Sequence, residues 1–285
     1  MSTTIRHDPP QGGRGTGPQG RRATLSVVVP AKNEAEGLPV LVGEIVGALR
    51  PLVARRVGNR LEAFEVVVVD DGSTDATASV LRELMGTCPE LRPIALTANA
   101  GQSAATAAGF RASAGDWVAT LDADLQNDPA DLAMLWDALP GHDVALGWRE
   151  KRRDVWSKRV ISRWANRIRN AALGQSIRDT GCSVRIFPRE MALRLPMFRG
   201  SHRFLGPLLI REGCSVVQRA VNHRERAHGI SHYNLWNRST KVVIDLFGVA
   251  WLMRRPVRYE VMSATSTSTS TPATHARQAA PAEVK

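Results

Sequence analysis

The sequence predicts an α/β fold in which a mostly parallel β-sheet is covered by helices on both faces. Between residues 25 and 146, short runs rich in valine alternate with segments whose apolar residues recur at helical spacing. The valine-rich runs are apolar throughout, which is typical of strands buried on both faces of a parallel sheet. The 285 residues are 43% hydrophobic and 23% charged, an ordinary globular composition, and the alternation of strand and helix favours parallel strands.

The individual elements follow in order from these patterns. Leu25–Val29 is a continuous apolar run and is expected to form the first strand. Leucine, isoleucine and valine at helical spacing predict a helix over residues 33–49. Asp128 suits the N-cap of a helix over residues 129–139, because Pro129 fits its first position. The same reasoning predicts strands over residues 64–69, 93–97, 117–121 and 144–146 and helices over residues 75–85 and 103–114.

The two ends of the chain depart from this pattern. Residues 1–23 are mostly glycine, proline, threonine and arginine, and we expect a disordered arm without a secretory signal. Residues 24–235 are expected to form the folded domain, residues 236–258 an amphipathic helix, and residues 259–285 a disordered low-complexity tail. The longest apolar run, Val242–Met253, is interrupted by an aspartate. It is shorter than the roughly 20 residues of a spanning helix, so no transmembrane helix is predicted.

The formal net charge of +11 is divided unevenly along the chain. Residues 24–146 carry 8 basic and 17 acidic side chains, a net charge of −9. Residues 147–258 carry 24 basic and 7 acidic side chains, a net charge of +17. Such an excess of positive charge favours anionic partners, namely nucleic acid, a membrane surface or a phosphorylated substrate. No known nucleic-acid-binding module is present, so we do not expect nucleic acid as a partner.

Polar clusters follow four of the predicted strands at their carboxyl ends. They are residues 30–34 (PAKNE), 70–75 (DDGSTD), 99–102 (NAGQ) and 122–126 (DADLQ). The carboxyl ends of parallel strands meet at one edge of a sheet, where α/β proteins bind their ligands. Turn chemistry alone does not account for four such clusters on one edge, so we expect a binding site there.

Asp122 and Asp124 are candidates for a metal site. Two carboxylates two residues apart, directly after a buried strand, can converge on one Mg²⁺ or Mn²⁺ ion, and Gln126 offers a further oxygen ligand. Taken alone, most Asp-x-Asp patterns are solvated or helix-capping carboxylates.

The cluster at residues 70–75 has two interpretations. Asp75 suits a helix N-cap and Gly72 permits a tight turn, so the cluster can be a simple strand-to-helix connection. Its acidic side chains, together with Asn33 and Glu34, can also accept hydrogen bonds from the base or ribose of a nucleotide. Neither GxGxxG nor GxxxxGK[ST] follows a predicted strand, which disfavours dinucleotide oxidoreductases and P-loop ATPases.

In combination, these motifs resemble the family 2 inverting glycosyltransferases of GT-A fold. Within that family they are similar to the polyprenyl-phosphate type, which includes dolichol-phosphate mannosyltransferase and the bacterial undecaprenyl-phosphate sugar transferases. The motifs occur in family order between residues 24 and 253: LSVVVPAKNE (25–34), VVVVDDGSTD (66–75), NAGQSAATAAGF (99–110), GDWVATLDADLQNDP (115–129), DTGCSVRIF (179–187) and HRERAHGISHYN (223–234). The octet DADLQNDP together with DDGSTD is highly specific. The QxxRW signature of processive polysaccharide synthases is absent, which disfavours polymerisation.

The resemblance implies a role for each matching residue on the donor side. Pro30, Glu34 and Asp71 would line the nucleoside pocket of a UDP- or GDP-linked sugar. A Mg²⁺ or Mn²⁺ ion and the donor diphosphate would be held by Asp122, Asp124 and Gln126.

The resemblance also implies catalytic and acceptor-side residues. Asp124, Asp179 and Arg185 are the implied catalytic residues, and in relatives the aspartate at the position of Asp179 is proposed as a base or as a group that orients the acceptor. Arg149 and Arg185 would meet phosphates. An element near the acceptor phosphate, R..G.S.Y, is matched by Arg226, Ser231 and Tyr233.

The implied activity is transfer of one sugar to a polyprenyl phosphate, with inversion. A monoalkyl phosphate has a second pKa of about 6 and is largely dianionic at neutral pH, so it attacks with little help from a base. The resemblance therefore supports Asp179 as an obligatory base less strongly than it supports the metal site. Two alternatives stay open: a glycosyltransferase that acts on a non-lipid hydroxyl, and a non-catalytic module that binds nucleotide sugars or anionic lipid.

Two segments of the basic half have amphipathic patterns. Residues 156–170 (WSKRVISRWANRIRN) place apolar side chains on one helical face and most basic side chains on the other. This pattern suits either an anionic lipid surface or ordinary docking on the protein itself, and residues 241–253 leave the same two interpretations. A polyprenyl acceptor implies a cytoplasmic enzyme bound peripherally at the inner face of the membrane.

Overall fold

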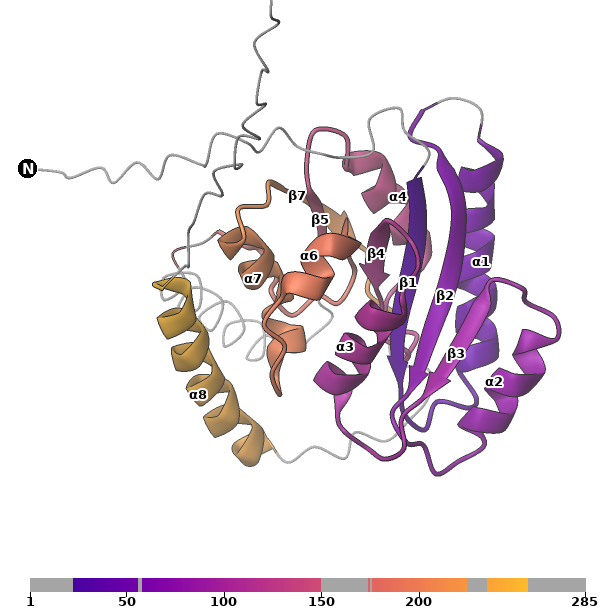
Figure 1. The fold of residues 1–285 in the computed structure, drawn as a ribbon, viewed down its shortest axis with the longest axis horizontal. Coiled ribbons are helices and arrows are strands. Elements are labelled where there is room, and N and C mark those ends of the chain that lie inside the picture. The colour runs from indigo at the N-terminus through magenta and orange to yellow at the C-terminus, as the bar shows by residue number, and fades with distance from the viewer. Residues whose placement is uncertain (1–22, 56–57, 150–173, 175, 225–234, 256–285) are drawn as a thin grey trace, which may run out of the picture. The chain divides into compact units, whose positions relative to one another are not determined.

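The computed structural model describes residues 23–55, 58–149, 174, 176–224 and 235–255, with the backbone alone for residues 235–243. These residues form a seven-stranded sheet in the order β3-β2-β1-β4-β6-β5-β7, with helices on both faces (Figure 1). Neighbouring strands are parallel, except that β6 runs antiparallel to both β4 and β5. The predicted mostly parallel α/β fold is therefore confirmed.

The elements have the following bounds. The strands are β1 (Ala23–Ala31), β2 (Leu61–Asp70), β3 (Leu91–Ala95), β4 (Trp117–Thr120), β5 (Val144–Arg149), β6 (Arg185–Pro188) and β7 (Val216–Val221). The helices are α1 (Leu38–Ala54), α2 (Thr77–Met85), α3 (Gln102–Ala112), α4 (Ala130–Ala138), α6 (Arg189–Arg194), α7 (Leu205–Arg211) and α8 (Leu235–Met253), with the 3₁₀-helix η1 at Ser201–Arg203. No helix in these described ranges is long and apolar enough to cross a membrane.

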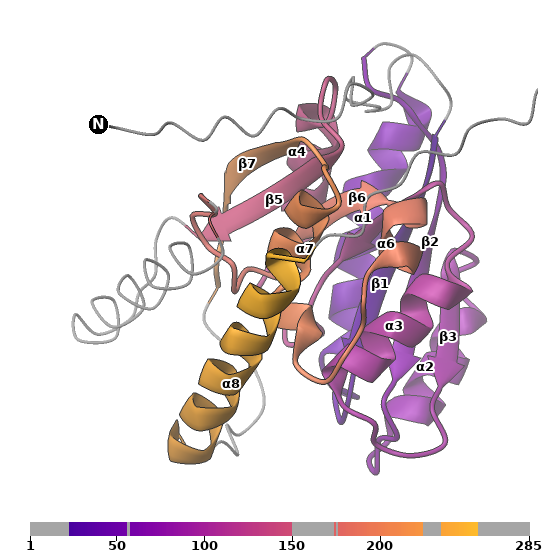
Figure 2. The same ribbon diagram turned by 60° about the vertical axis from the view of Figure 1, so that its left-hand side comes forward.

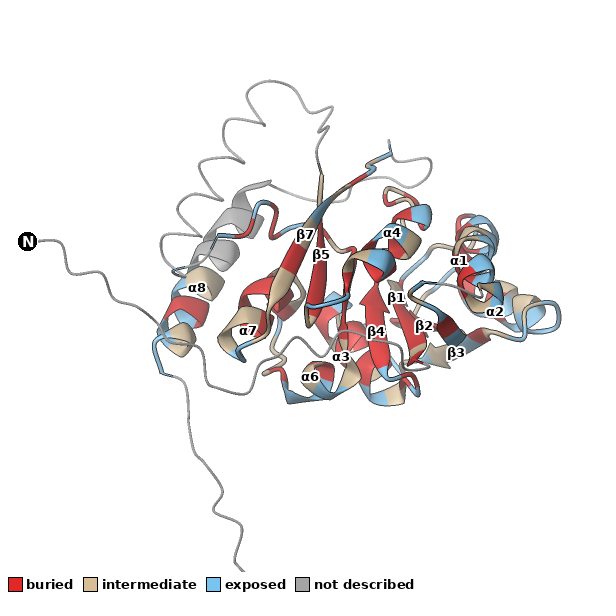
Figure 3. Cartoon of the chain, turned by 90° about the horizontal axis from the view of Figure 1, so that it is seen from above, coloured by how far each residue is buried: buried red, intermediate tan, exposed pale blue. Residues whose placement is uncertain are grey.

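The sheet separates two hydrophobic cores. On β1, Val27 and Val29 pack into the core that is shared with α1, α2 and α4. Val28 points to the other side, where the core is completed by α3, α6, α7 and α8. Figure 3 shows that the central strands are buried along most of their length. Burial on both faces is the reason why the strand sequences are continuous apolar runs instead of alternating ones.

Strand register brings the predicted polar clusters to one edge. Ala31 at the end of β1 pairs with Asp70 at the end of β2, and Asp70 in turn pairs with Ala95 at the end of β3. Thr120 at the end of β4 pairs with Val28, so the turn that carries Asp122 follows directly beside the others. The four clusters therefore meet at the carboxyl edge, as expected for a parallel sheet.

The first helix begins later than predicted. The periodic pattern placed it over residues 33–49, whereas α1 begins at Leu38 and ends at Ala54. Asn33 has a φ of 55°, in the left-handed region, and its side-chain oxygen accepts a hydrogen bond from the Thr74 amide at 2.8 Å. This bond to the neighbouring loop holds the residues before Leu38 outside the helix.

Two strands lacked any sequence signal. β6 has only four residues and lies between β4 and β5, and β7 forms the edge of the sheet beside β5. The positions of both strands are fixed by pairing with their neighbours, with β7 beside β5 (Figure 2), and not by a local pattern. The insertion of β6 places Arg185 opposite Thr120, so the basic half of the chain contributes directly to the edge that carries the acidic clusters.

Gly109 is required by the close approach of α3 to the sheet. A Cβ atom at this position would overlap Val28 Cγ1 and lie 3.2 Å from Val69 Cγ2. Gly109→Ala is therefore expected to lower the free energy of unfolding by roughly 1–3 kcal/mol through overpacking, as measured by urea denaturation.

The matched control is Gly43→Ala in α1, where a Cβ atom would meet nothing within 4 Å. This change is expected to raise the free energy of unfolding by roughly 0.5–1 kcal/mol, because alanine loses less backbone entropy in a helix. Equal effects of the two substitutions would show that α3 does not approach the sheet as closely as described.

Candidate active site

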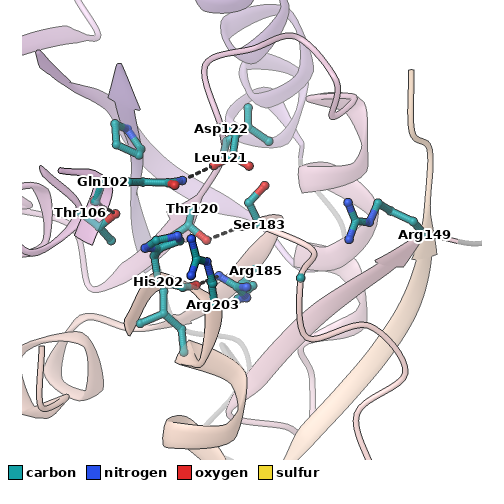
Figure 4. A pocket seen from close by; sticks show the side chains of 13 residues that line it. Gln102, Thr106, Thr120, Leu121, Asp122, Arg149, Ser183, Arg185, His202 and Arg203 are labelled. Atoms are coloured by element: carbon teal, nitrogen blue, oxygen red, sulfur yellow. Dashed lines mark hydrogen bonds between the residues drawn. The ribbon is translucent and has the colours of Figure 1, made fainter. Parts of the chain in front are cut away.

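A cleft of about 300 Å³ opens at the carboxyl edge of the sheet. Four of the residues expected at the site line it: Pro30, Asp122, Arg149 and Arg185. The remaining lining residues belong to α3, β4, the turn after β4, the residues before β6, η1 and α7, and Figure 4 labels most of them. The cleft therefore joins the acidic and the basic halves of the chain.

The turn after β4 holds all three predicted metal ligands, Asp122, Asp124 and Gln126. The backbone amide of Gln126 donates a hydrogen bond to Asp124 Oδ1 at 3.2 Å. Leu125, between these two residues, has a φ of 59°, in the left-handed region that leucine rarely adopts. Its side chain is buried, so packing maintains a backbone conformation that costs energy, as happens at functional sites. The turn reverses the chain directly after Asp124.

Asp122 is surrounded by hydrogen-bond donors. Gln102 Nε2 donates to Asp122 Oδ1 at 2.8 Å (Figure 4), and the Ser183 hydroxyl also bonds to the carboxylate. Asn127 Nδ2 donates to Ser183 Oγ at 2.9 Å and keeps that hydroxyl in place. These contacts fix the position of the Asp122 carboxylate on the edge of the cleft.

The charge at this turn fits a divalent cation. Burial and the negative charge of Asp124 raise the pKa of Asp122, against the effect of the nearby Ser183 hydrogen bond and of two arginines. Two carboxylates that repel each other, with the amide oxygen of Gln126 on the same turn, form an all-oxygen set of the kind that Mg²⁺ and Mn²⁺ prefer. No group of three or more histidine, cysteine or acidic residues suited to a metal occurs among the residues that the structure describes.

The segment after β7 is bonded to the same turn. The Arg224 amide donates to the Gln126 carbonyl at 2.8 Å, and Asn127 and His223 form an isolated antiparallel bridge. Arg224 Nη2 lies 3.0 Å from Asp128 Oδ1. Asp128 Oδ1 also accepts the Ala130 backbone amide at 3.0 Å, but α4 begins at Ala130 with Pro129 at the N-cap, one residue later than predicted. The described residues directly before the predicted acceptor element therefore lie beside the turn that carries Asp122 and Asp124.

Asp179 forms a two-fold ion pair with Arg149. Arg149 Nε donates to Asp179 Oδ2 at 2.6 Å, and Arg149 Nη2 donates to Oδ1 at 3.0 Å. The Gly181 amide also donates to Oδ1 at 3.1 Å. Burial lowers the pKa of Arg149, but the hydrogen bond and charge of Asp179 more than offset this and raise it. Both oxygens of the Asp179 carboxylate are therefore engaged.

Arg185 places a buried positive charge at the cleft. Arg185 is 5% exposed. Its guanidinium donates hydrogen bonds to the backbone carbonyls of His202 at 3.3 Å and of Thr180 at 3.2 Å. Burial lowers the pKa of Arg185, in opposition to nearby acidic groups. Among the described residues no carboxylate lies within ion-pair distance of this guanidinium. A buried cation with only neutral acceptors fits an anionic ligand such as phosphate.

Asp71 connects two of the edge loops. Its carboxylate accepts the Ala100 amide at 2.7 Å and the Gly101 amide at 2.9 Å, at the start of α3. Gly72, with a φ of +64°, lies so close to Ala98 that a Cβ atom would be 2.7 Å from its carbonyl carbon. The end of β2 and the start of α3 are therefore held together tightly, and Asp71 is buried between them.

Asp75 has the structural role that the turn interpretation predicts. Asp75 Oδ1 accepts the Thr77 amide at 3.0 Å at the start of α2, and Oδ2 accepts the Ala35 amide at 3.3 Å. The Glu34 amide donates to Thr77 Oγ1 at 3.0 Å. These bonds join the loop after β1 to the loop after β2 beside the predicted nucleoside residues.

Some predicted residues lie outside the described part of the chain, and some lining residues were missed. Arg226, Ser231 and Tyr233, as well as the helix predicted over residues 156–170, fall outside the described residues. The further residues that line the cleft include Gln102, Ser183, His202 and Arg203. Gln102 and Ser183 belong to motifs that the sequence does display, whereas His202 and Arg203 follow no motif and enter the site only through the fold.

The mostly parallel sheet thus carries two acidic residues on the turn after β4 and a cationic wall across the cleft from them. The family model "Glycosyl transferase family 2" matches residues 26–195, and the chain belongs to this family.

Curated relatives extend the match. The chain is 34% identical over 251 residues to a dodecaprenyl-phosphate galacturonate synthase of Rhizobium johnstonii, with 86% of this chain and 72% of the relative covered. It is 37% identical over 242 residues to an undecaprenyl-phosphate 4-deoxy-4-formamido-L-arabinose transferase of Pseudomonas paraeruginosa, with 82% of this chain and 66% of the relative covered. The corresponding transferase of Aeromonas hydrophila is 33% identical, with 74% of this chain and 63% of the relative covered. The chain thus spans slightly less than two thirds of these two transferases.

Solved structures share the fold. A mannosyltransferase from Pyrobaculum calidifontis in complex with GDP-Man and Mn²⁺ superposes with a TM-score of 0.56 at 22% identity, covering 84% of this chain and 66% of that one. Glucosyl-3-phosphoglycerate synthase from Mycobacterium tuberculosis, in complex with Mn²⁺, UDP and phosphoglyceric acid, gives a TM-score of 0.56 at 21% identity, covering 82% and 80%.

Asp131 gives the site a pH-dependent contribution to stability. It is buried, its Oδ2 accepts the Asn222 amide at 2.7 Å, and burial raises its pKa from 3.8 to about 6. Between these values the unfolded chain releases this proton and the folded chain keeps it, so the contribution falls as pH rises. Asp131→Asn should have the same free energy of unfolding as the wild type near pH 4. Near pH 7, the free energy of unfolding of the variant should be higher than that of the wild type by at most roughly 3 kcal/mol.

Urea denaturation at both pH values checks this expectation. The asparagine oxygen still accepts the Asn222 amide, so the comparison isolates the charge. A difference between variant and wild type that is the same at both pH values would contradict the raised pKa of Asp131.

Proposed function

We propose that this chain transfers one sugar from a UDP- or GDP-linked donor to a polyprenyl phosphate, with inversion at the anomeric carbon. The observation that carries the proposal is the pairing of opposite charges across one cleft. The acidic turn at Asp122 and Asp124 suits a cation and a diphosphate, and the buried guanidinium of Arg185 suits a phosphate. The relatives named for dodecaprenyl and undecaprenyl phosphate support this class of acceptor.

The donor would bind at the acidic side of the cleft. Pro30, Glu34 and Asp71 would contact the nucleoside, and Asp122, Asp124 and Gln126 would hold Mg²⁺ or Mn²⁺. When bound, the metal ion supplies charge neutralisation of the diphosphate leaving group. Neighbours of similar fold that contain Mn²⁺ support a divalent ion at this position.

The acceptor would bind at the basic side. A phosphate oxygen of the acceptor forms the new bond to the anomeric carbon as the bond from that carbon to the diphosphate oxygen breaks, and the nucleoside diphosphate leaves. Because the acceptor phosphate is already largely dianionic at neutral pH, no side chain has to remove a proton. Asp179, engaged by Arg149, would then orient this arginine toward a phosphate, and positioning would supply most of the catalysis.

A membrane surface is the further partner that we propose, at the inner face of the cytoplasmic membrane. Seven large hydrophobic side chains are exposed among the described residues, and three of them, Ile244, Phe247 and Trp251, recur at helical spacing on one face of α8. The opposite face of α8 packs into the core through Val249 and Ala250. The Arg255 guanidinium lies 5.0 Å from the centre of the Trp251 ring. An apolar face bordered by arginine is typical of helices that lie on anionic lipid.

The activity is tested with a panel of UDP- and GDP-sugars, undecaprenyl phosphate and Mn²⁺. One donor is expected to give a lipid-extractable, acid-labile glycosyl phosphate. Asp124→Ala should lower turnover at least about 100-fold, because charge stabilisation by a bound metal is worth several kcal/mol. Asp137→Ala, an exposed carboxylate on α4, should remain close to the wild type.

Other outcomes would contradict parts of the proposal. Full activity of Asp124→Ala would exclude the metal role of the turn, and absence of product with every donor would exclude the transfer itself. Equal transfer to a soluble hydroxyl without lipid would favour the hydroxyl-acceptor alternative. That reaction requires a base, so Asp179→Asn should then be as damaging as Asp124→Ala, whereas it should be clearly milder with a phosphate acceptor.

Membrane binding is tested by sedimentation with phosphatidylglycerol vesicles and, for comparison, phosphatidylcholine vesicles. Phe247→Ser and Trp251→Ser should each weaken binding to the anionic vesicles roughly tenfold, since each removes a large apolar side chain from the contact. Met85→Ser, which changes another exposed large hydrophobic residue, on α2, is the control and should bind as the wild type does. Loss of binding in this control, or none in the α8 variants, would contradict the assignment.

A further inference from the structure

A buried serine determines which ring nitrogen of His202 carries the proton. Ser103, in the first turn of α3, is buried, and its Oγ lies 2.7 Å from His202 Nδ1. The amides of Gly200 and His202 donate to the same oxygen, at 3.0 and 3.5 Å. A serine hydroxyl has two acceptor sites and one proton to donate. The two backbone amides approach the acceptor sites of the hydroxyl, an arrangement that favours donation of its proton to Nδ1.

The consequence is a defined neutral tautomer. A nitrogen that accepts a hydrogen bond carries no proton, and a neutral imidazole then has its proton on the other nitrogen. Nε2 of His202 is therefore a hydrogen-bond donor. Since Ser103 holds Nδ1, Nε2 is the nitrogen that can act on a ligand in the cleft that His202 lines (Figure 4).

The surroundings of His202 indicate what this donor would bind. The His202 carbonyl accepts from Arg185 Nη1 at 3.3 Å, and Arg203 follows in the chain and lines the same cleft. This wall carries two guanidinium groups and one imidazole N–H, all of which donate hydrogen bonds. A ligand group that only accepts, such as a phosphate, complements a wall of donors.

We propose that His202 is a substrate-binding residue that donates its Nε2–H to a phosphate oxygen in the cleft, and that Ser103 positions it by fixing the tautomer. The phosphate is the donor diphosphate or the acceptor phosphate, and in this respect the inference rests on the proposed function. Ser103 neighbours Gln102, which bonds to Asp122, so the first turn of α3 would position both the acidic and the phosphate-binding sides.

Two substitutions separate this role from a structural one. His202→Asn keeps an oxygen near the position of Nδ1 that can accept from Ser103, but it has no group at the position of Nε2. His202→Gln places an amide N–H near the position of Nε2 and loses the bond to Ser103. Phosphate binding therefore predicts that the glutamine variant is better than the asparagine variant, and a structural role predicts the reverse order.

The KM values for donor and acceptor are measured separately with each variant. His202→Asn should raise one KM about 10- to 100-fold, the effect of losing one hydrogen bond to a charged group, while His202→Gln should stay within about threefold. A rise in the acceptor KM assigns the acceptor phosphate, and a rise in the donor KM assigns the diphosphate. Equal KM values in both variants, or a better asparagine variant, would overturn the proposal. His142→Asn and His142→Gln, outside the cleft lining, are the controls.

A second measurement does not depend on turnover. Long-range ¹H–¹⁵N correlation spectra of the full chain distinguish the two neutral tautomers of histidine. The wild type should show His202 protonated at Nε2, and Ser103→Ala should mix the tautomers, whereas Ser113→Ala, a buried serine bonded to the Gly109 carbonyl, should not. A wild-type His202 protonated at Nδ1 would overturn the proposal.

Direct binding separates a failure of this inference from a failure of the proposed function. Calorimetry with inorganic pyrophosphate and with farnesyl phosphate should show at least one of the two binding about 10- to 100-fold more weakly to His202→Asn than to His202→Gln. This result would support the histidine role even if no nucleotide sugar were turned over. Equal binding of both probes to the two variants would overturn it.

Discussion

Two like charges on one short turn, those of Asp122 and Asp124, are the constraint on which the rest of the site depends. Their repulsion and partial burial make the negative charge unfavourable unless donors or cations surround it. Gln102 and Ser183 supply donors from elements that are remote in sequence. Leu125 keeps the turn in a costly left-handed conformation that only a packed environment maintains. The turn therefore favours the binding of a cation.

The insertion of β6 explains how the two oppositely charged halves of the chain form one site. The net charge of −9 over residues 24–146 and of +17 over residues 147–258 is separated along the sequence. β6 crosses back between β4 and β5 and places Arg185 opposite Thr120, two residues before Asp122. A buried guanidinium thus lies beside the acidic turn, and among the described residues no carboxylate is within ion-pair distance of it. Charges of opposite sign on one cleft suit a ligand that carries both a cation and phosphates.

The sequence determines the acidic side of the site more directly than the basic side. β1, β2 and β4 are continuous apolar runs, and their polar ends meet by the geometry of parallel strands, so Pro30, Asp71 and Asp122 could be placed from local patterns. β6 and β7 are fixed by pairing and not by periodicity, and α1 begins late because Asn33 bonds to another loop. His202 was missed for the same reason, since its orientation depends on a hydroxyl 99 positions away in the sequence.

Helix α3 connects the acidic and the basic sides of the cleft through side-chain hydrogen bonds. Its first two residues, Gln102 and Ser103, bond to Asp122 and His202 respectively, so their spacing on one helical turn sets the relative positions of an acidic and a donor side chain. The distance of the helix from the sheet is fixed where Gly109 contacts Val28. Close-packed interiors transmit such displacements because they contain few voids that could absorb them. The small residues of α3 therefore keep Asp122 and His202 at fixed relative positions, although none of these small residues takes part in the reaction itself.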